Sequence, residues 1–384
     1  MATFSRTTFD AAAYLTFRPS YPKWVHDKVL TYHFGVRPTP SSANRCIAGS
    51  SLALDLGCGP GISTVSLLPH FDKVIGLDPS SKMVDAAITP STPELPSNLI
   101  PKISDGAKGR LGNIEYKQGY SEELEFLEDH SVDLVTSGQA AHWFDYPKLW
   151  KELTRVVRPG GSVCLYGYPD FFLPDFPTTR SLLNRFALKE GHGPESSHRS
   201  EPVDVEIDEI DSIGEYWEQP GRSIVNQGLN PVPFPSTYPE LEAQWDEASA
   251  FKRTFSTSGL TKDQIWSSWP PLTTSVFEAN ALSEQVKTEF VGEQAQATMD
   301  KYLTWEQLAN YLRTWSATHT YLTEHKEDKQ NNGGKDVVDR FLEKLKIQVT
   351  RANNGNEVEK LHLRWPLCFV MIKKKVWTNY ECKK

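Results

Sequence analysis

The feature that most constrains the fold of this 384-residue chain is a glycine-rich turn between two apolar runs. The segment Leu52–Ile62 reads LALDLGCGPGI, in which an apolar run carries Asp55 and is followed by glycines at 57, 59 and 61. A second apolar run starts after Lys73 and ends at Asp78, twenty-three positions after Asp55. This order predicts a strand, a tight turn, a helix and a second strand with a carboxylate at its tip.

The glycine spacing indicates a ligand that has a ribose but no phosphate. The dinucleotide fingerprint needs its third glycine at position 62, where this chain has Ile62. No basic side chain lies in the turn, and no Lys-Ser or Lys-Thr pair follows it to cradle a phosphate. Asp78 is placed to accept hydrogen bonds from two ribose hydroxyls. The sequence therefore predicts a nucleoside site.

Apolar runs alternate with helical patterns between residues 51 and 168. The predicted strands are 51–57, 74–77, 114–117, 132–137 and 163–167, and the predicted helices are 62–68, 82–88 and 146–157. Residues 89–112 are rich in Pro, Ser, Gly and Asn, which is typical of a surface insertion. The alternation predicts an α/β fold with a doubly wound, mostly parallel sheet.

The pattern changes after residue 168, where strand alternation disappears. We expect a mainly helical cap over 169–325 that contributes to acceptor binding, with its clearest helix at 304–321. Residues 326–384 should add a final helix at 337–347 and a closing hairpin of 357–365 with 367–374. Residues 1–50 form an N-terminal arm, and 51–168 form the nucleoside-binding core.

Composition narrows the classes of partner. The net charge of −8 argues against a nucleic-acid surface, and no apolar run approaches a membrane span or a secretory signal. Five scattered cysteines without a Cys-x-x-Cys pair predict neither a disulfide framework nor a metal site. We expect a cytoplasmic monomer or homodimer that acts on a small molecule.

The acidic-x-Gly-x-Gly-x-Gly turn resembles the first motif of the class I S-adenosylmethionine-dependent methyltransferases. The pattern Tyr-x-x-x-Arg-Pro-x-Tyr-Pro at residues 14–22 is similar to the small-molecule subgroup that includes the fungal trans-aconitate methyltransferases. The Gln-x-x-His-Trp segment at 139–143 and the helix around 311–316 add to this resemblance. It implies a seven-stranded, Rossmann-like sheet whose last strand is antiparallel, and S-adenosyl-L-methionine as the cofactor.

The resemblance also implies where the cofactor lies. Asp55 and the turn backbone would line its methionine portion, Asp78 would bind the ribose, and Met83 would pack against the adenine. The arm would fold over the cofactor. The candidate cofactor-binding residues are Tyr14, Arg18, Asp55, Gly57, Cys58, Gly59, Gly61, Asp78, Met83, Tyr120, Ser121 and Gln139.

The acceptor should lie beside the segment that follows the fourth strand, because strand ends in an open α/β sheet face the ligand crevice. The candidate acceptor-binding residues are Tyr21, Gln139, His142, Trp143 and Trp315. His142 is the candidate catalytic residue, as a general base for a hydroxyl acceptor or as an orienting group for a carboxylate, which needs no base. In the second case Arg18 or Arg313 would help to orient the carboxylate.

We therefore expect methyl transfer from the cofactor to a carboxylate oxygen of a small organic acid or a related metabolite. One alternative is C-, N- or hydroxyl O-methylation in secondary metabolism. Another is a methyltransferase-fold protein that binds the cofactor without transferring its methyl group. The acidic balance, and the absence of an Asn-Pro-Pro-Tyr-type motif after the fourth strand, disfavour RNA and protein acceptors.

Overall fold

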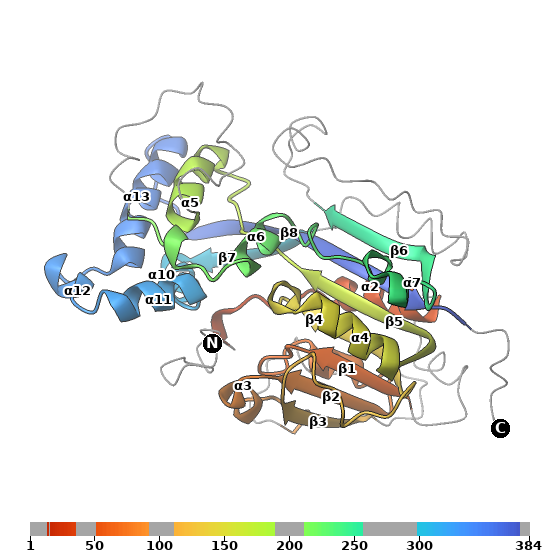
Figure 1. The fold of residues 1–384 in the computed structure, drawn as a ribbon. Helices are drawn as coiled ribbons and strands as arrows, with labels where there is room; N and C mark the ends of the chain where they lie inside the picture. Colours follow the sequence, from red (N-terminus) through yellow and green to blue (C-terminus); the bar gives the residue numbers. More distant parts are fainter. Residues whose placement is uncertain are drawn as a thin grey trace.

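A computed structural model describes residues 14, 16–35, 51–91, 111–188, 211–255 and 298–376 (Figure 1). Residues 1–13 and 36–50 of the predicted arm lie outside these residues, as do most of the predicted surface insertion and parts of the predicted cap. Within the described ranges, no helix is long and apolar enough to cross a membrane.

The parallel half of the sheet follows the sequence prediction closely. Its strands run in the spatial order β3-β2-β1-β4-β5, and all four neighbouring pairs are parallel. The strands are β1 (Leu52–Leu56), β2 (Lys73–Asp78), β3 (Asn113–Gln118), β4 (Val132–Gly138) and β5 (Val157–Gly167). β1, β2 and β4 are almost wholly buried, because helices and loops cover both faces of a parallel sheet.

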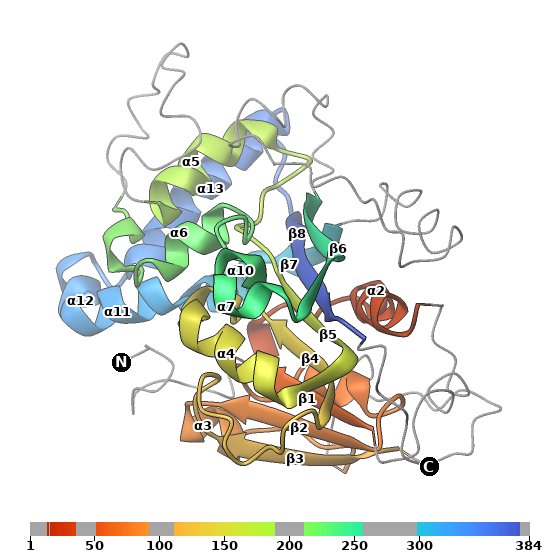
Figure 2. The same ribbon diagram turned by 45° about the vertical axis from the view of Figure 1, so that its right-hand side comes forward.

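Alternate strand residues pack into two separate cores. Ala53 and Leu134 lie in one hydrophobic cluster with residues of α2 (Lys23–Phe34). Leu54 and Val135 lie in a second cluster with residues of α4 (Tyr146–Val156). The two helices therefore cover opposite faces of the sheet, as Figure 2 shows.

The antiparallel end of the sheet differs from the predicted closing hairpin. Residues 360–374 form one long strand, β8 (Lys360–Lys374), which continues through Pro366. Its second half pairs with β5 on one side and with β6 (Trp245–Phe255) on the other. Its first half pairs with β7 (Thr298–Thr304), so β8 changes partner at Pro366 instead of turning back. The predicted hairpin was wrong because the proline marks this change of partner.

The main path of the sheet therefore has seven strands, β3-β2-β1-β4-β5-β8-β6, with β7 as an eighth strand beside β8. This architecture confirms the predicted doubly wound, mostly parallel class. The strands β6 and β7 come from residues 169–325, the segment predicted to be mainly helical. Their alternation is weak: β6 carries four charged residues.

Predicted helices are shortened or broken where they approach the glycine turn and the cap. Predicted helix 62–68 is one 3-10 turn, η3 (Thr64–Leu67), and 82–88 is reduced to α3 (Ser81–Asp85). Predicted helix 304–321 is two helices, α10 (Trp305–Arg313) and α11 (Ser316–Glu324), with a break at Thr314 and Trp315. The other helices are η4 (Ala141–Trp143), η5 (Pro177–Thr179), α5 (Arg180–Ala187), η7 (Gly214–Tyr216), α6 (Gly221–Asn226), η8 (Pro235–Thr237), α7 (Pro239–Glu242), α12 (Asp328–Asn331) and α13 (Val337–Ala352).

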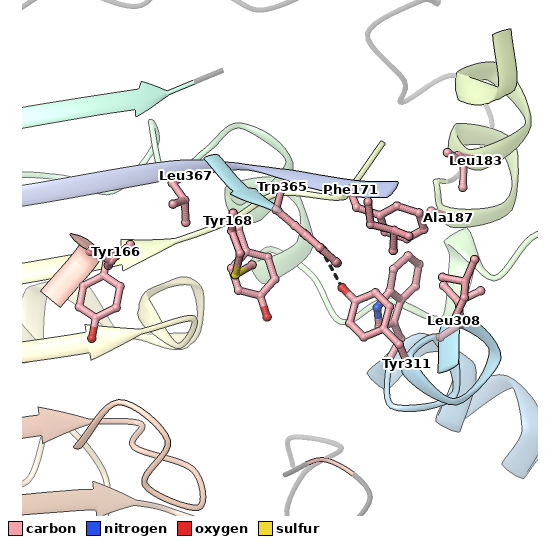
Figure 3. Close-up of a cluster of buried hydrophobic side chains, with 14 of the residues drawn as sticks. Tyr166, Tyr168, Phe171, Leu183, Ala187, Leu308, Tyr311, Trp365 and Leu367 are labelled. Atoms are coloured by element: carbon pink, nitrogen blue, oxygen red, sulfur yellow. Dashed lines mark hydrogen bonds between the residues drawn. The ribbon is translucent and has the colours of Figure 1, made fainter. Parts of the chain in front are cut away.

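An aromatic cluster joins the sheet to the α10–α11 region (Figure 3). Trp365 of β8 donates a hydrogen bond from its indole Nε1 to the Tyr311 hydroxyl at 3.2 Å. Phe171 packs against the Tyr311 ring at 6.0 Å between centroids and against Trp365 at 5.7 Å. This packing fixes α10 beside the end of β5, next to the site described below.

Candidate functional site

Two cavities adjoin at the carboxyl ends of β1, β2, β4 and β5. The first has a volume of about 370 Å³ and extends over the glycine turn, and the second has a volume of about 70 Å³. The walls of both cavities share six residues: Tyr14, Arg18, Gln139, Trp143, Tyr168 and Glu218. These six residues form the neck between the cavities.

The glycine turn forms the floor of the first cavity. Gly57, Gly59 and Gly61 have φ of +62°, +54° and +82°, in the left-handed region that favours glycine. A Cβ at Gly57 would overlap Ala140, and one at Gly61 would overlap the Tyr116 hydroxyl. A Cβ at Gly59 would meet nothing within 4 Å, and Gly59 lines the cavity, so a ligand can approach its backbone closely.

Asp55 is held at the end of β1 by two hydroxyl groups. Its Oδ2 accepts a hydrogen bond from Thr64 at 2.6 Å, and its Oδ1 accepts one from Thr136 at 2.9 Å. Burial raises the pKa of Asp55 to about 6, although both hydroxyl contacts lower it. The carboxyl group is therefore ionised at neutral pH and places a negative charge in the cavity wall.

Asp78 closes the opposite side of the turn. Its Oδ2 accepts a hydrogen bond from Gly59 N–H at 2.8 Å, and its Oδ1 accepts one from Ser80 N–H at 2.9 Å. Burial raises the pKa of this carboxyl group, and the two N–H contacts oppose the shift. Ser80 also caps the first turn of α3, which places the buried Met83 against Tyr14. Each Asp78 oxygen keeps a lone pair for a further donor.

Gln139 links the ends of β4 and β5. Its Nε2 donates to the Tyr168 carbonyl at 2.9 Å, while its Oε1 accepts from Tyr168 N–H at 2.8 Å. The Tyr21 hydroxyl donates to the same Oε1 at 3.4 Å. The φ of Gln139 is +63°, which is uncommon for a residue with a side chain and is held here by the paired hydrogen bonds. Gln139 therefore fixes the geometry of the neck.

Arg18 carries a positive charge into the neck. Its guanidinium lies 5.0 Å from the Tyr14 ring centroid and 5.8 Å from that of Tyr311. Its Nη2 donates to the Thr314 carbonyl at 2.9 Å, which the break between α10 and α11 leaves available. Among the described residues, no carboxylate forms an ion pair with Arg18, and its buried Nε has no hydrogen-bond partner.

The second cavity combines aromatic rings with an ion pair. Trp217, Tyr311 and Trp315 line it together with Arg222 and Asp170. Arg222 forms an ion pair with Asp170, and its guanidinium lies 4.0 Å from the Trp217 ring centroid.

His142 lines this second cavity beside Trp143. The two ring centroids lie 4.8 Å apart. Burial, together with the positive charges of Arg222 and Arg18, lowers the pKa of His142 to about 3. The imidazole is therefore neutral at physiological pH and is a weak base.

The structure brings most of the predicted site residues together. Every candidate cofactor-binding residue except Gly61 lines the first cavity, and Tyr21 and Trp143 join them there. His142 and Trp315 line the second cavity and not the first. Tyr120 is 58% exposed at the rim of the first cavity, whereas Ser121 beside it is buried.

Arg313 was a wrong choice as an orienting residue. It forms ion pairs with Asp336 and Asp339 at the start of α13 and lines neither cavity. The predicted single helix would have carried Arg313 and Trp315 together. The break at Thr314 instead places Arg313 at the end of α10, and of the two only Trp315 lines the second cavity. The structure places Arg18 in the neck instead.

Sequence reasoning missed several residues of the cavity walls. They are Glu122, Tyr168, Asp170, Trp217, Glu218, Tyr311 and Arg222. Tyr168 directly follows β5, so the rule that strand ends face the crevice could have identified it. Trp217, Glu218 and Arg222 lie in a stretch without a recognisable motif.

No group of three potential metal ligands occurs within the described ranges.

Much of the wall of the first cavity comes from a segment that is similar to known proteins. Residues 54–165 match the family model described as "Methyltransferase domain". The Saccharomyces cerevisiae protein named "Probable S-adenosylmethionine-dependent methyltransferase CRG1" is 28% identical over 187 residues, which are 48% of this chain and 54% of that protein. An uncharacterized methyltransferase of Schizosaccharomyces pombe is 30% identical over 161 residues, 41% of this chain and 49% of that protein. The chain thus spans about half the length of these curated relatives.

Among solved structures, a candidate type II methyltransferase from Anaeromyxobacter dehalogenans is similar with a TM-score of 0.48 and 19% identity. The similarity covers 94% of this chain and 100% of that one.

The family match and the relatives identify residues 54–165 as an S-adenosylmethionine-dependent methyltransferase domain. S-Adenosylmethionine is the cofactor of such a domain.

Proposed function

We propose that the whole chain transfers a methyl group from S-adenosylmethionine to a carboxylate oxygen of a small organic acid. The observation that carries this proposal is the Arg18 guanidinium, which lies in the neck without a carboxylate partner among the described residues. A buried charge without a counter-charge is costly, so this position favours an anionic group, which both a carboxylate acceptor and the amino-acid portion of S-adenosylmethionine have. The cofactor would occupy the first cavity and the acceptor the second.

The roles proposed for the cofactor residues follow their geometry. The free lone pairs of Asp78 would accept the ribose hydroxyls, and Met83 with Tyr14 would flank the adenine. Asp55 would place its negative charge near the positively charged methionine portion. Gly59 would let the backbone approach that portion closely.

A carboxylate acceptor suits a buried site because the reaction removes charge. One carboxylate oxygen forms a bond to the methyl carbon as the sulfonium–carbon bond breaks, and that electron pair returns to sulfur. The products are a neutral methyl ester and a neutral thioether, so no proton has to move. Separated charges are costly in a low-dielectric cavity, and their mutual neutralisation is therefore favoured there.

The same geometry disfavours the other acceptor classes. A neutral amine acceptor would become a positively charged product, which the Arg18 guanidinium in the neck would repel. A hydroxyl acceptor would need a general base, and the pKa of His142 is about 3. We propose that His142 and Trp143 orient the acceptor.

The second candidate is a protein that binds the cofactor without transferring its methyl group. The hydrogen-bonded carboxyl groups of Asp55 and Asp78 support cofactor binding in either case. What supports transfer is the second cavity, which shares the six neck residues with the cofactor cavity and so lies directly beside it. The trans-aconitate resemblance of residues 14–22 also supports an organic acid as acceptor.

The test is methyl transfer from methyl-labelled cofactor to benzoic acid, benzyl alcohol and benzylamine, which share a ring and differ in the accepting group. We expect transfer to the acid, and loss of about 100-fold in kcat/KM in Arg18→Gln, because a charge-assisted contact contributes about 1.5–3 kcal/mol. Arg351→Gln makes the same substitution at an exposed position of α13 and should leave the rate unchanged.

Preferred transfer to the alcohol or the amine would overturn the carboxylate assignment. Cofactor binding without transfer to any of the three, or to a non-aromatic acid such as trans-aconitate, would favour the second candidate.

A further inference from the structure

The size of the second cavity limits the acceptor. The volume of about 70 Å³ is about half that of a cavity of about 150 Å³ that binds benzene. The space beyond the neck therefore holds an acceptor no larger than about one six-membered ring.

Aromatic side chains form one wall of this space. The Trp315 ring centroid lies 5.5 Å from that of Trp217 and 5.8 Å from that of Tyr311, and all three residues line the cavity. Figure 3 shows Tyr311 projecting from the α10 region toward the end of β5, where Tyr168 lies. Aromatic rings gain additional energy from offset or edge contacts with another ring. This wall therefore favours a flat ring over a puckered aliphatic one.

Within the described ranges, the charged groups around the cavity offer one unpaired guanidinium to a carboxylate. Arg222 is already paired with Asp170, whereas Arg18 has no carboxylate partner among the described residues. Glu218 adds a negative side chain to the neck. A second carboxylate on the acceptor would have to be buried without a counter-charge, which is costly.

We propose that the acceptor is a flat monocarboxylic acid of one-ring size, with its carboxylate beside Arg18 and its ring against Trp217, Tyr311 and Trp315. This inference rests on the proposed carboxylate methylation and specifies its substrate class. It differs from the trans-aconitate resemblance, because trans-aconitate has three carboxylates and no ring.

The experiment compares kcat/KM of the wild-type protein for benzoate, cyclohexanecarboxylate, benzene-1,4-dicarboxylate and trans-aconitate, with S-adenosylmethionine as donor. Benzoate and cyclohexanecarboxylate differ in flatness, and benzoate and the dicarboxylate differ in one charge. We expect benzoate to exceed each of the others by at least about tenfold, the effect of one or two aromatic contacts or of one uncompensated charge. Equal or higher values for any of the other three would overturn the inference while leaving carboxylate methylation intact.

Transfer to none of the four acids, with cofactor binding retained, would instead count against the proposed function itself. The two failures are therefore distinguishable.

Variants at Trp315 test the aromatic wall directly. Trp315→Leu should reduce the ratio of kcat/KM for benzoate over cyclohexanecarboxylate to about one, whereas Trp315→Phe keeps a ring and should retain most of it. Trp24→Leu, in α2 and outside both cavities, is the matched control and should keep the wild-type ratio. If Trp315→Leu does not fold, a wild-type ratio in Trp315→Phe supports the inference. A ratio unchanged in a folded Trp315→Leu would overturn it.

Discussion

Replacing Asp78 with asparagine tests the proposed cofactor orientation. The change keeps the size of the side chain but removes its charge and one acceptor oxygen. Hydrogen bonds to charged groups contribute about 1.5–3 kcal/mol and neutral ones about 0.5–1.5, so each ribose hydroxyl should lose about 1 kcal/mol. For two hydroxyls the loss is about 2 kcal/mol, or about 30-fold in affinity.

The same variant should also destabilise the glycine turn. The carboxyl group accepts hydrogen bonds from both Gly59 N–H and Ser80 N–H, and an asparagine has one oxygen for these two donors. One buried N–H is left without a partner, which costs about 1–3 kcal/mol of unfolding free energy.

The assay is isothermal titration of S-adenosylhomocysteine, together with urea unfolding of the free protein. An analogue without the ribose 2′-hydroxyl should bind the wild type more weakly, and Asp78→Asn should weaken its binding less than that of the parent ligand. The matched control is Asp72→Asn, because Asp72 is exposed and bonds Ser51 just before β1. If the variant weakened both ligands by the same factor, Asp78 would not contact the 2′-hydroxyl.

Three further predictions concern the turn and the neck. Burial raises the pKa of Asp55 to about 6 from an ordinary value of 3.8, so this carboxyl group is neutral below about pH 6. Calorimetric titration should therefore show that the affinity for S-adenosylmethionine falls about tenfold from about pH 7.5 to pH 5. In Asp55→Asn the affinity should not change with pH. Because the folded state binds the Asp55 proton more tightly than the unfolded state does, the stabilisation from this group should be lost as the pH rises from about 4 to 6, and the free energy of unfolding should fall. In urea unfolding, Gly61→Ala should lower the free energy of unfolding by about 2–4 kcal/mol, through strain and overlap with Tyr116, and Gly59→Ala should lower it by only about 1 kcal/mol. Gly59→Ala should lose more cofactor affinity than Gly61→Ala. Equal losses of stability in the two variants would contradict this explanation. His142→Gln should lower kcat/KM by no more than about tenfold, with no inflection in the pH–rate profile near neutrality, whereas a larger loss rescued by added imidazole would show a general base.

The parallel half of the fold was predictable because most of its strands contain an apolar run, although β3 (NIEYKQ) carries polar residues throughout. β1, β2 and β4 are buried on both faces, so their sequences carry little polar interruption, and a glycine turn marks the first crossover. The antiparallel end was less predictable. β6 contains charged residues, and Pro366 resembles a turn although β8 continues through it. Pairing with three neighbouring strands overrides that local signal.

The cofactor side of the site was also readable from local sequence. Asp55, the glycines and Asp78 lie within one strand–turn–helix–strand unit, so their proximity follows from chain geometry. The acceptor side joins Arg18 to Thr314, positions 296 residues apart, and depends on a break between α10 and α11. Nothing local in the sequence fixes such a long-range contact, and for that reason Arg313 looked as suitable as Arg18.

The most direct test of the proposed reaction is an NMR spectrum of the product made from benzoate and S-adenosylmethionine that carries a ¹³C label in its methyl group. The chemical shift and the coupling of the labelled carbon identify the atom to which it is bound. We expect an ester methyl group, released as methanol by mild base and formed about 100-fold more slowly when Arg18→Gln replaces the wild type at equal concentration. A labelled methyl group on carbon, nitrogen or an ether oxygen, stable to the same base, would contradict the assignment of this site to carboxylate methylation.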